Sequence, residues 1–76
     1  MKDLVEYIAK SIASKPDEVT VTEETNDEEV TLIKLEVAPE DKGKMIGSQG
    51  RVAQAMRLIL RIAAVKDGTR AMLEIV

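Results

Sequence analysis

Two glycines three residues apart, Gly47 and Gly50, constrain the fold of this 76-residue chain more than any other feature. They lie in the stretch Gly-Lys-Met-Ile-Gly-Ser-Gln-Gly-Arg, residues 43–51, between two segments with apolar residues at helical spacing. Glycine has no Cβ atom and adopts backbone conformations that are costly for other residues. The pair therefore predicts a sharp turn that joins two helices.

The helices on the two sides of this turn differ in length. Pro39, Glu40 and Asp41 indicate a helix start, because proline suits the first turn and acids complement the positive end of the helix dipole. A short helix is expected over residues 39–46 and a longer one over residues 51–66. The predicted core face of the longer helix is apolar and consists of Val52, Ala55, Met56, Ile59, Leu60 and Ala63. Its predicted solvent face is polar and consists of Gln54, Arg57 and Arg61.

The remaining segments predict one more helix and three strands. Apolar residues at three- and four-residue spacing indicate an N-terminal helix over residues 2–14. Alternating β-branched residues indicate a strand over residues 19–22, and turn-forming residues follow at 25–28. Residues 30–37 predict a second strand, antiparallel to the first, and the apolar residues 71–76 predict a third.

The second predicted strand carries apolar residues in both parities. Ile33, Leu35 and Val37 alternate on one face, whereas Val30 and Leu32 fall on the other. This pattern predicts either burial of both faces at one end of the strand or a β-bulge.

The expected order of elements is helix, strand, strand, helix, helix, strand, which is typical of the α+β class. We expect a three-stranded sheet with the helices packed on one face, because that arrangement buries all of the apolar stripes. A chain of this length has room for one domain and one modest core, so residues 1–76 are predicted to form a single domain.

The absence of cysteine and histidine limits the chemistry that this chain can perform. Disulfides, thiol nucleophiles and zinc–thiolate sites are excluded, and the commonest general base and transition-metal ligand is missing. We therefore expect neither an enzyme nor a site for a metal or cofactor. No apolar run is long enough to cross a membrane, and acids stand where a signal peptide carries basic residues, so a soluble, cytoplasmic protein is expected.

The two halves of the chain carry opposite charge. Residues 1–38 contain four lysines and ten acids, whereas residues 39–76 contain seven lysines and arginines and four acids. The net charge of −3 argues against nucleic-acid binding, but a local basic face decides whether a polyanion can dock. The C-terminal half is therefore the candidate binding surface, and the acidic residues 23–29 are expected to form a solvated hairpin tip.

The glycine spacing in the turn fits neither a Walker loop nor a dinucleotide fingerprint, but it suits a clamp for a nucleic-acid backbone. Without side chains, the two glycines let the turn approach phosphates, and amides at the start of the next helix point toward phosphate oxygens. Three cations flank the turn, namely Lys42, Lys44 and Arg51. We expect the bases to lie in an adjoining apolar groove lined by Ile46, Val52 and either Leu35 or Val37.

Residues 39–57, from Pro-Glu-Asp-Lys-Gly through Ile-Gly-Ser-Gln-Gly-Arg to Ala-Met-Arg, resemble the core of the KhpA family, small bacterial proteins with one KH domain. The resemblance extends over the whole chain. It implies the type II KH arrangement, whose last two strands run parallel, and a cytoplasmic RNA-binding protein with a GxxG loop that holds about four nucleotides. It also implies a homodimer, a heterodimer with a larger KH-containing partner called KhpB (also Jag or EloR), and roles in post-transcriptional regulation, as an RNA chaperone, or in cell elongation or division.

Transferred to this chain, the resemblance assigns contact with single-stranded RNA to residues around the turn, namely Lys42, Lys44, Ile46, Gly47, Ser48, Gln49, Gly50, Arg51, Val52 and Arg57. Relatives often carry a cation between the two glycines, whereas this chain has the neutral pair Ser48-Gln49. We therefore expect weak binding with little sequence selectivity. The alternative is a KH-fold interaction subunit with little RNA affinity of its own, which acts through the larger partner.

Other prominent side chains have simpler interpretations. Arg61 is expected to be a solvated charge, and Tyr7 is expected to pack on a helix flank. Three methionines are expected to fill gaps in the core or at an interface, namely Met45, Met56 and Met72.

Overall fold

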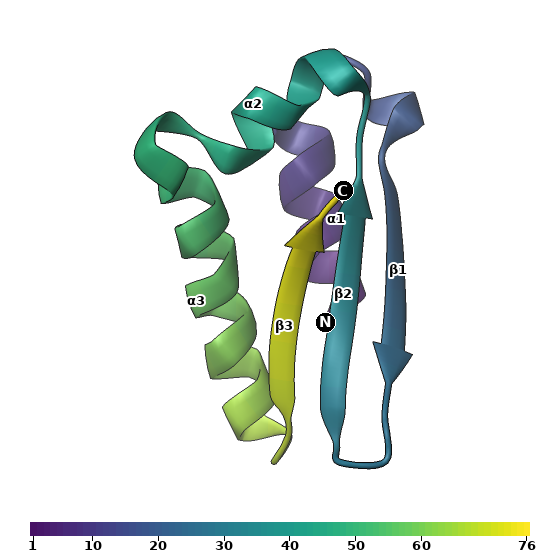
Figure 1. Ribbon diagram of the computed structural model, residues 1–76, viewed down its shortest axis with the longest axis vertical. Helices are drawn as coiled ribbons and strands as arrows, with labels where there is room; N and C mark the ends of the chain where they lie inside the picture. The colour runs from purple at the N-terminus through teal and green to yellow at the C-terminus, as the bar shows by residue number, and fades with distance from the viewer.

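Helices and strands follow one another in the predicted order in the computed structural model, which describes residues 1–76 (Figure 1). The helices are α1 (Lys2–Ile12), α2 (Lys42–Ile46) and α3 (Arg51–Lys66), and the strands are β1 (Thr20–Thr25), β2 (Val30–Glu36) and β3 (Arg70–Ile75). Short 3-10 helices precede β1, α2 and α3, at Pro16–Glu18, Pro39–Asp41 and Ser48–Gly50. The predicted α+β class and the order α-β-β-α-α-β are confirmed.

The sheet is mixed and has the strand order β1-β2-β3. β1 pairs antiparallel with β2, from Thr20 opposite Glu36 to Thr25 opposite Thr31. β2 pairs parallel with β3, and the intervening chain crosses over through α2 and α3. This is the type II KH arrangement that the resemblance implies. It leaves β3 at one edge of the sheet, beside α3 (Figure 1).

The pairing of β2 with both neighbours is continuous, so the predicted bulge is absent. Ile33 and Leu35 are fully buried on the face that the helices cover. Val30 and Leu32 lie on the open face and are half-buried there. Cross-strand neighbours shield part of each side chain, since Leu32 stands between Glu24 of β1 and Met72 of β3.

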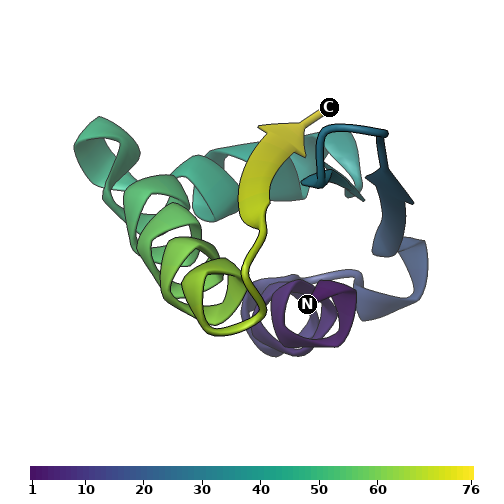
Figure 2. The same cartoon turned by 90° about the horizontal axis from the view of Figure 1, so that it is seen from below.

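The core lies between the covered face of the sheet and the helices. Figure 2 shows that α1 and α3 lie on the same side of the sheet. The largest fully buried apolar side chains come from β2, α2, α3 and α1, and they are Ile33, Leu35, Met45, Met56, Leu60 and Val5. Met45 is the one buried residue of the five-residue helix α2. Its burial fixes α2 against the core and so helps to position the turn that follows.

The buried side of α3 differs from the predicted one. Its buried residues are Ala53, Met56, Leu60 and Ala64. Two residues of the predicted core face, Ala55 and Ile59, are exposed instead. The prediction failed because apolar residues surround most of this helix, while a helix at the edge of a sheet buries only a narrow stripe.

Three apolar side chains remain exposed on the far side of α3, and we call them the outer stripe. Leu58, Ile62 and Val65 are 53%, 52% and 70% exposed. They are four and three residues apart, so they form one ridge along the helix. Arg57 and Arg61 lie between the buried stripe and the outer stripe, on the side of β3, rather than opposite the core.

The simpler interpretations of other side chains are partly confirmed. Met45 and Met56 are core residues, with 0% and 2% exposed. Tyr7 is 74% exposed and does not pack on a helix flank, and Met72 is 60% exposed on the open face of the sheet. None of the helices combines the length and the apolar character that crossing a membrane requires.

Candidate nucleic-acid interface

The turn between α2 and α3, which we call the 47–50 turn, has a backbone that glycine adopts most readily. Gly47 has φ 79° and ψ 173°, and Gly50 has φ 74°. A Cβ atom on Gly47 would lie 2.5 Å from Cγ2 of Val52, so this position also requires the absence of a side chain. A Cβ atom on Gly50 would meet open space. The predicted sharp turn is confirmed, and Gly47 is its more constrained position.

The 47–50 turn leaves two backbone amides without a hydrogen bond. The N–H of Gly47 donates to the carbonyl of Gly43 at 2.8 Å, and that of Gly50 donates to the carbonyl of Gly47 at 3.1 Å. The N–H groups of Ser48 and Gln49 donate to no backbone carbonyl of the chain. Both residues are exposed and stand at the N-terminal end of α3, where the helix dipole is positive. The turn therefore presents two donors and a partial positive charge to the solvent.

Most of the predicted contact residues gather around this turn. Those beside the turn that are exposed are Lys42, Lys44, Ile46, Ser48, Gln49 and Arg51. Val52 is half-buried, because it packs beneath Gly47. Arg57 lies farther along α3, beside β3.

Lys44 is directed toward the segment that follows α1. Its ammonium donates a hydrogen bond to Oγ of Ser14 and lies 3.9 Å from Oδ1 of Asp41. The side chain is half exposed, but its charge is already partly neutralised by the carboxylate. Among the cations that flank the turn, Arg51 is therefore freer than Lys44 to meet a phosphate.

The apolar groove is not where the sequence predicts it. Leu35 and Val37 are only 0% and 8% exposed, so neither lines an open groove. A shallow groove instead runs between α3 and β3. Its part nearer the 47–50 turn has a volume of about 190 Å³ and is lined by Arg57, Leu60, Arg61, Ala71, Met72 and Leu73. The next part has a volume of about 320 Å³ and shares with the first Arg61, Ala71 and Met72.

Five residues that line the part of this α3–β3 groove nearer the turn are missing from the predicted contact set, namely Leu60, Arg61, Ala71, Met72 and Leu73. The apolar pattern of residues 71–76 indicates that a strand is present, but it does not indicate which strand lies beside α3. The parallel pairing of β3 with β2 decides that, because it puts β3 at the sheet edge next to the crossover helix. The missed residues are thus a consequence of topology.

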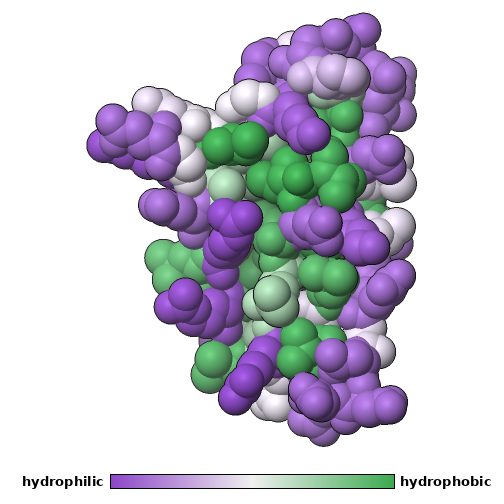
Figure 3. All heavy atoms as spheres, viewed as in Figure 1, coloured by the Kyte–Doolittle hydropathy of each residue, from purple (hydrophilic) through white to green (hydrophobic).

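The arginines of α3 and β3 are free of ion pairs. The cations that lie within 4.0 Å of a carboxylate are Lys10, Lys15, Lys44 and the N-terminal ammonium. No carboxylate pairs with Arg51, Arg57, Arg61 or Arg70. Figure 3 shows apolar side chains gathered on the open side of the sheet with hydrophilic ones between them, and a hydrophilic projection at the upper left where α2 meets α3. Apolar surface beside unpaired arginines suits a ligand that combines flat bases with phosphates.

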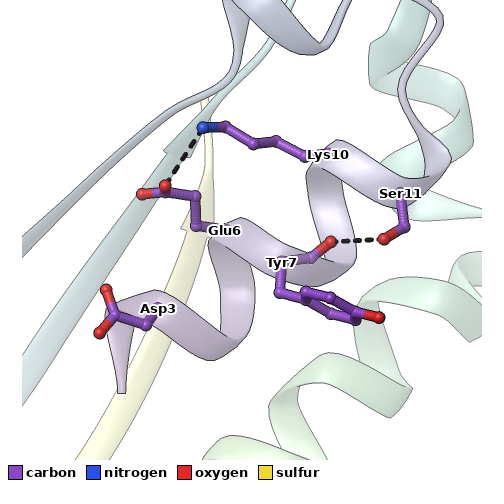
Figure 4. Close-up of a pocket in the computed structure, with 5 residues that line it drawn as sticks. All are labelled: Asp3, Glu6, Tyr7, Lys10 and Ser11. Carbon is purple, nitrogen blue, oxygen red and sulfur yellow. Dashed lines mark hydrogen bonds and ion pairs between the residues drawn. The ribbon is translucent and has the colours of Figure 1, made fainter.

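A second hollow lies on the outer face of α1 and has a different chemistry (Figure 4). Nζ of Lys10 pairs with Oε1 of Glu6 at 3.2 Å, and Oγ of Ser11 donates to the carbonyl of Tyr7 at 2.8 Å. The remaining charge is the carboxylate of Asp3. Because the single cation is paired, this hollow offers a polyanion less than the groove beside β3 does.

Comparisons with known proteins agree with this geometry. The family model described as "KhpA/KhpB, KH domain" matches residues 2–75. A protein of Clostridium acetobutylicum named RNA-binding protein KhpA is 50% identical over 76 residues, which is the full length of both chains. Proteins of the same name from Clostridium perfringens and Caldanaerobacter subterraneus are each 46% identical, also over the full length of both chains. No solved structure matches the chain. The family match and the three full-length relatives show that this chain belongs to the KhpA/KhpB family of KH-domain proteins.

Proposed function

We propose that this protein binds single-stranded RNA and clamps its sugar–phosphate backbone at the 47–50 turn. The observation that carries the proposal is the pair of unbonded amides of Ser48 and Gln49 at the positive end of α3. Gly47 and Gly50 allow the backbone of the turn to approach a phosphate closely. Relatives that match along the whole chain carry the name RNA-binding protein. Two neutral donors and a helix dipole form a weaker clamp than a lysine does, so the binding is weak.

The rest of the contact set supports this clamp. Lys42 and Arg51 flank it with positive charge, and Ile46 and Val52 provide apolar surface beside it. From the clamp, the RNA strand runs along the α3–β3 groove. There, Arg57 contacts a phosphate or a base edge, and the bases pack on the apolar floor of the groove. A KH domain holds about four nucleotides in this way. Lys44 contributes less, because Ser14 and Asp41 already occupy its ammonium.

The protein acts as a homodimer in this proposal, and the outer stripe of α3 is the contact. An exposed ridge of three large apolar side chains is unfavourable in water, and a two-fold axis packs the ridge against its own copy. The stripe begins two turns beyond the 47–50 turn, so both clamps stay open in such a dimer. Two weak sites in one dimer gain affinity through avidity. The same ridge suits a heterodimer with a larger KhpB-like partner.

The proposal also includes the domain organisation, location and cellular role of the protein. Residues 1–76 form one KH domain without enzymatic activity, and the protein works in the cytoplasm as a post-transcriptional regulator or RNA chaperone. The second candidate function is an interaction subunit with little RNA affinity of its own. Two observations favour it: the neutral pair Ser48-Gln49 and the exposed outer stripe.

A titration of a labelled, unstructured RNA at two salt concentrations tests the clamp. The double variant Ser48→Asp/Gln49→Asp places two negative charges at exposed positions of the turn, and an Asp at position 49 tolerates the positive φ of 56° found there. We expect salt-sensitive binding by the natural protein and loss of binding by this variant. The matched control, Ser11→Asp/Thr22→Asp, adds the same charge away from the turn and leaves binding nearly unchanged. Equal binding by both variants contradicts the clamp, and no binding by the natural protein supports the interaction subunit.

Sedimentation over a range of protein concentrations tests the dimer. Ile62→Glu places a charge in the middle of the outer stripe, so we expect a monomer where the natural protein is a dimer. Thr22→Glu, which adds the same charge on exposed β1, is the control and stays dimeric. A natural protein that is monomeric at all concentrations contradicts the homodimer.

A further inference from the structure

Asp41 is not one of the residues assigned to the clamp, and its carboxylate is fully buried. Its Oδ1 accepts a hydrogen bond from the backbone N–H of Ser14 at 2.9 Å, and its Oδ2 accepts one from the backbone N–H of Lys15 at 3.0 Å. Ser14 and Lys15 lie two and three residues after the end of α1, whereas Asp41 is the residue before α2. One side chain thus joins two segments that are 26 residues apart in the sequence.

Further contacts reinforce this junction. The ammonium of Lys44 bridges Oγ of Ser14 and Oδ1 of Asp41, and Nζ of Lys15 pairs with Oε1 of Glu40 at 2.8 Å. A buried carboxylate is stable only when hydrogen bonds and an opposite charge compensate its lost hydration, and both are present here. The amide of Ser14, followed by that of Lys15, holds the pKa of Asp41 below its usual range despite the opposing effect of burial.

The junction lies at one end of α2, and the 47–50 turn lies at the other. A helix of five residues has too few internal hydrogen bonds to be stable alone, so tertiary contacts hold it in place. Met45 packs α2 against the core, and Asp41 ties its first turn to the end of α1. A single buried side chain leaves a short helix free to tilt or unwind, and a second fixed point removes that freedom. The orientation of Gly47 therefore depends on both contacts.

We propose that Asp41 is a positioning residue for the RNA clamp, which holds the 47–50 turn in its open-amide geometry through the short helix α2. This inference rests on the proposed function for its RNA readout only. Its structural content, the coupling of the α1 end to the turn, holds for the protein without RNA. Lys44 accordingly has a different role from the predicted one: its charge stabilises the buried carboxylate of Asp41 rather than contacting a phosphate.

The variant Asp41→Asn tests the coupling with little change of shape. One amide oxygen replaces two carboxylate oxygens, so one of the two backbone N–H groups loses its acceptor and Lys44 loses its counter-charge. Amide hydrogen exchange by NMR, without RNA, is the first readout. We expect faster exchange at Gly47 and Gly50, whose amides are hydrogen-bonded, and unchanged exchange in the middle of β2. RNA affinity then falls about tenfold. Asp17→Asn, which changes an exposed carboxylate that takes part in no ion pair, is the matched control and leaves both readouts unchanged.

Separate outcomes distinguish the two proposals. Unchanged exchange at Gly47 and Gly50 in folded Asp41→Asn overturns the positioning role, whatever the RNA result is. Faster exchange in Asp41→Asn, combined with a natural protein that binds no RNA, sustains the coupling and overturns the proposed function instead. If Asp41→Asn does not fold, an acid titration of the natural protein replaces it. The amide chemical shifts of Ser14, Lys15 and Gly47 are then expected to change with pH at one shared midpoint, below the usual carboxyl range. Different midpoints for the three amides contradict the coupling.

Discussion

Two tight turns of this small protein, one between strands and one between helices, treat their backbone amides in opposite ways. At the β1–β2 hairpin, Asn26 takes part in four hydrogen bonds, with Glu28, Glu29 and twice with Val30. At the 47–50 turn, the amides of Ser48 and Gln49 have no backbone acceptor. Water satisfies exposed amides that make no hydrogen bond within the chain, and the phosphate oxygens of a ligand can replace that water. A turn that only connects strands closes its own hydrogen bonds, whereas a turn that binds keeps some of them open.

The charges around the two turns differ in the same sense. The hairpin end is acidic, with Glu23, Glu24, Asp27, Glu28 and Glu29. The clamp end continues along α3 into two unpaired arginines, Arg57 and Arg61. A polyanion is thus repelled from one end and attracted to the other, even though the whole chain has a net charge of −3. The net charge of a small protein conceals the difference in charge between its two ends, on which its binding depends.

The largest expected effect comes from a methyl group on Gly47. Gly47→Ala brings a Cβ atom within 2.5 Å of Val52 and keeps φ at a value that L-residues rarely adopt. We expect the free energy of unfolding to fall by about 3 kcal/mol, measured by urea denaturation. Gly50→Ala is the matched variant, since its Cβ atom meets open space and only the positive φ is strained, which costs about 1 kcal/mol. Equal losses in the two variants contradict the close approach of Gly47 to Val52.

The arginines beside the groove are expected to control the salt dependence of binding. Arg57→Gln/Arg61→Gln removes two cations that no carboxylate neutralises, so RNA affinity falls by about tenfold at low salt. The slope of log affinity against log salt decreases by about 1.4, because each phosphate contact on a single strand contributes about 0.7. Lys10→Gln, which removes a cation already paired with Glu6, serves as the control and keeps the slope. An unchanged slope in the arginine variant shows that the RNA strand does not follow the α3–β3 groove.

These arginines also mark the limit of what the sequence reveals. Periodicity and the glycine pair predict the order of elements and the 47–50 turn, because both are local properties of the chain. The orientation of α3 is not local: apolar residues on nearly all sides of the helix allow several faces to be buried. The groove requires the parallel pairing of β3, and the engagement of Lys44 requires Ser14, which lies 30 residues away. Neither contact leaves a periodic signal.

The hairpin turn offers the reverse test of the comparison. Asn26→Ala removes the Oδ1 acceptor of two backbone amides, those of Glu28 and Val30. We expect the free energy of unfolding to fall by about 1 kcal/mol, because the amides near an exposed loop regain water. RNA affinity is expected to stay the same under conditions in which the protein is folded. A change in affinity indicates that the acidic end takes part in binding, which removes the contrast between the two turns.

The smallest expected effect is a pH dependence that distinguishes the two ends. Asn26 holds the hairpin without a titratable group, whereas a carboxylate holds the start of α2. The hydrogen bond from the Ser14 amide lowers the pKa of Asp41 in the folded protein, so its contribution to stability is fully present above the unfolded value of about 3.9. That contribution is lost as the pH falls below about 4 toward the folded pKa.

Urea denaturation between about pH 2 and pH 6 measures this dependence, with Asp41→Asn and Asn26→Ala compared in parallel. Asp41→Asn is expected to flatten the acid limb of the stability curve, whereas Asn26→Ala lowers the whole curve without changing its shape. Lys15 provides the alkaline counterpart, because its hydrogen bond to Glu40 raises its pKa and adds stability that is lost as the pH rises above about 10.5. An acid limb that is equally steep in all three proteins means that carboxylates other than Asp41 cause it. The buried carboxylate of Asp41 then makes no pH-dependent contribution to folding.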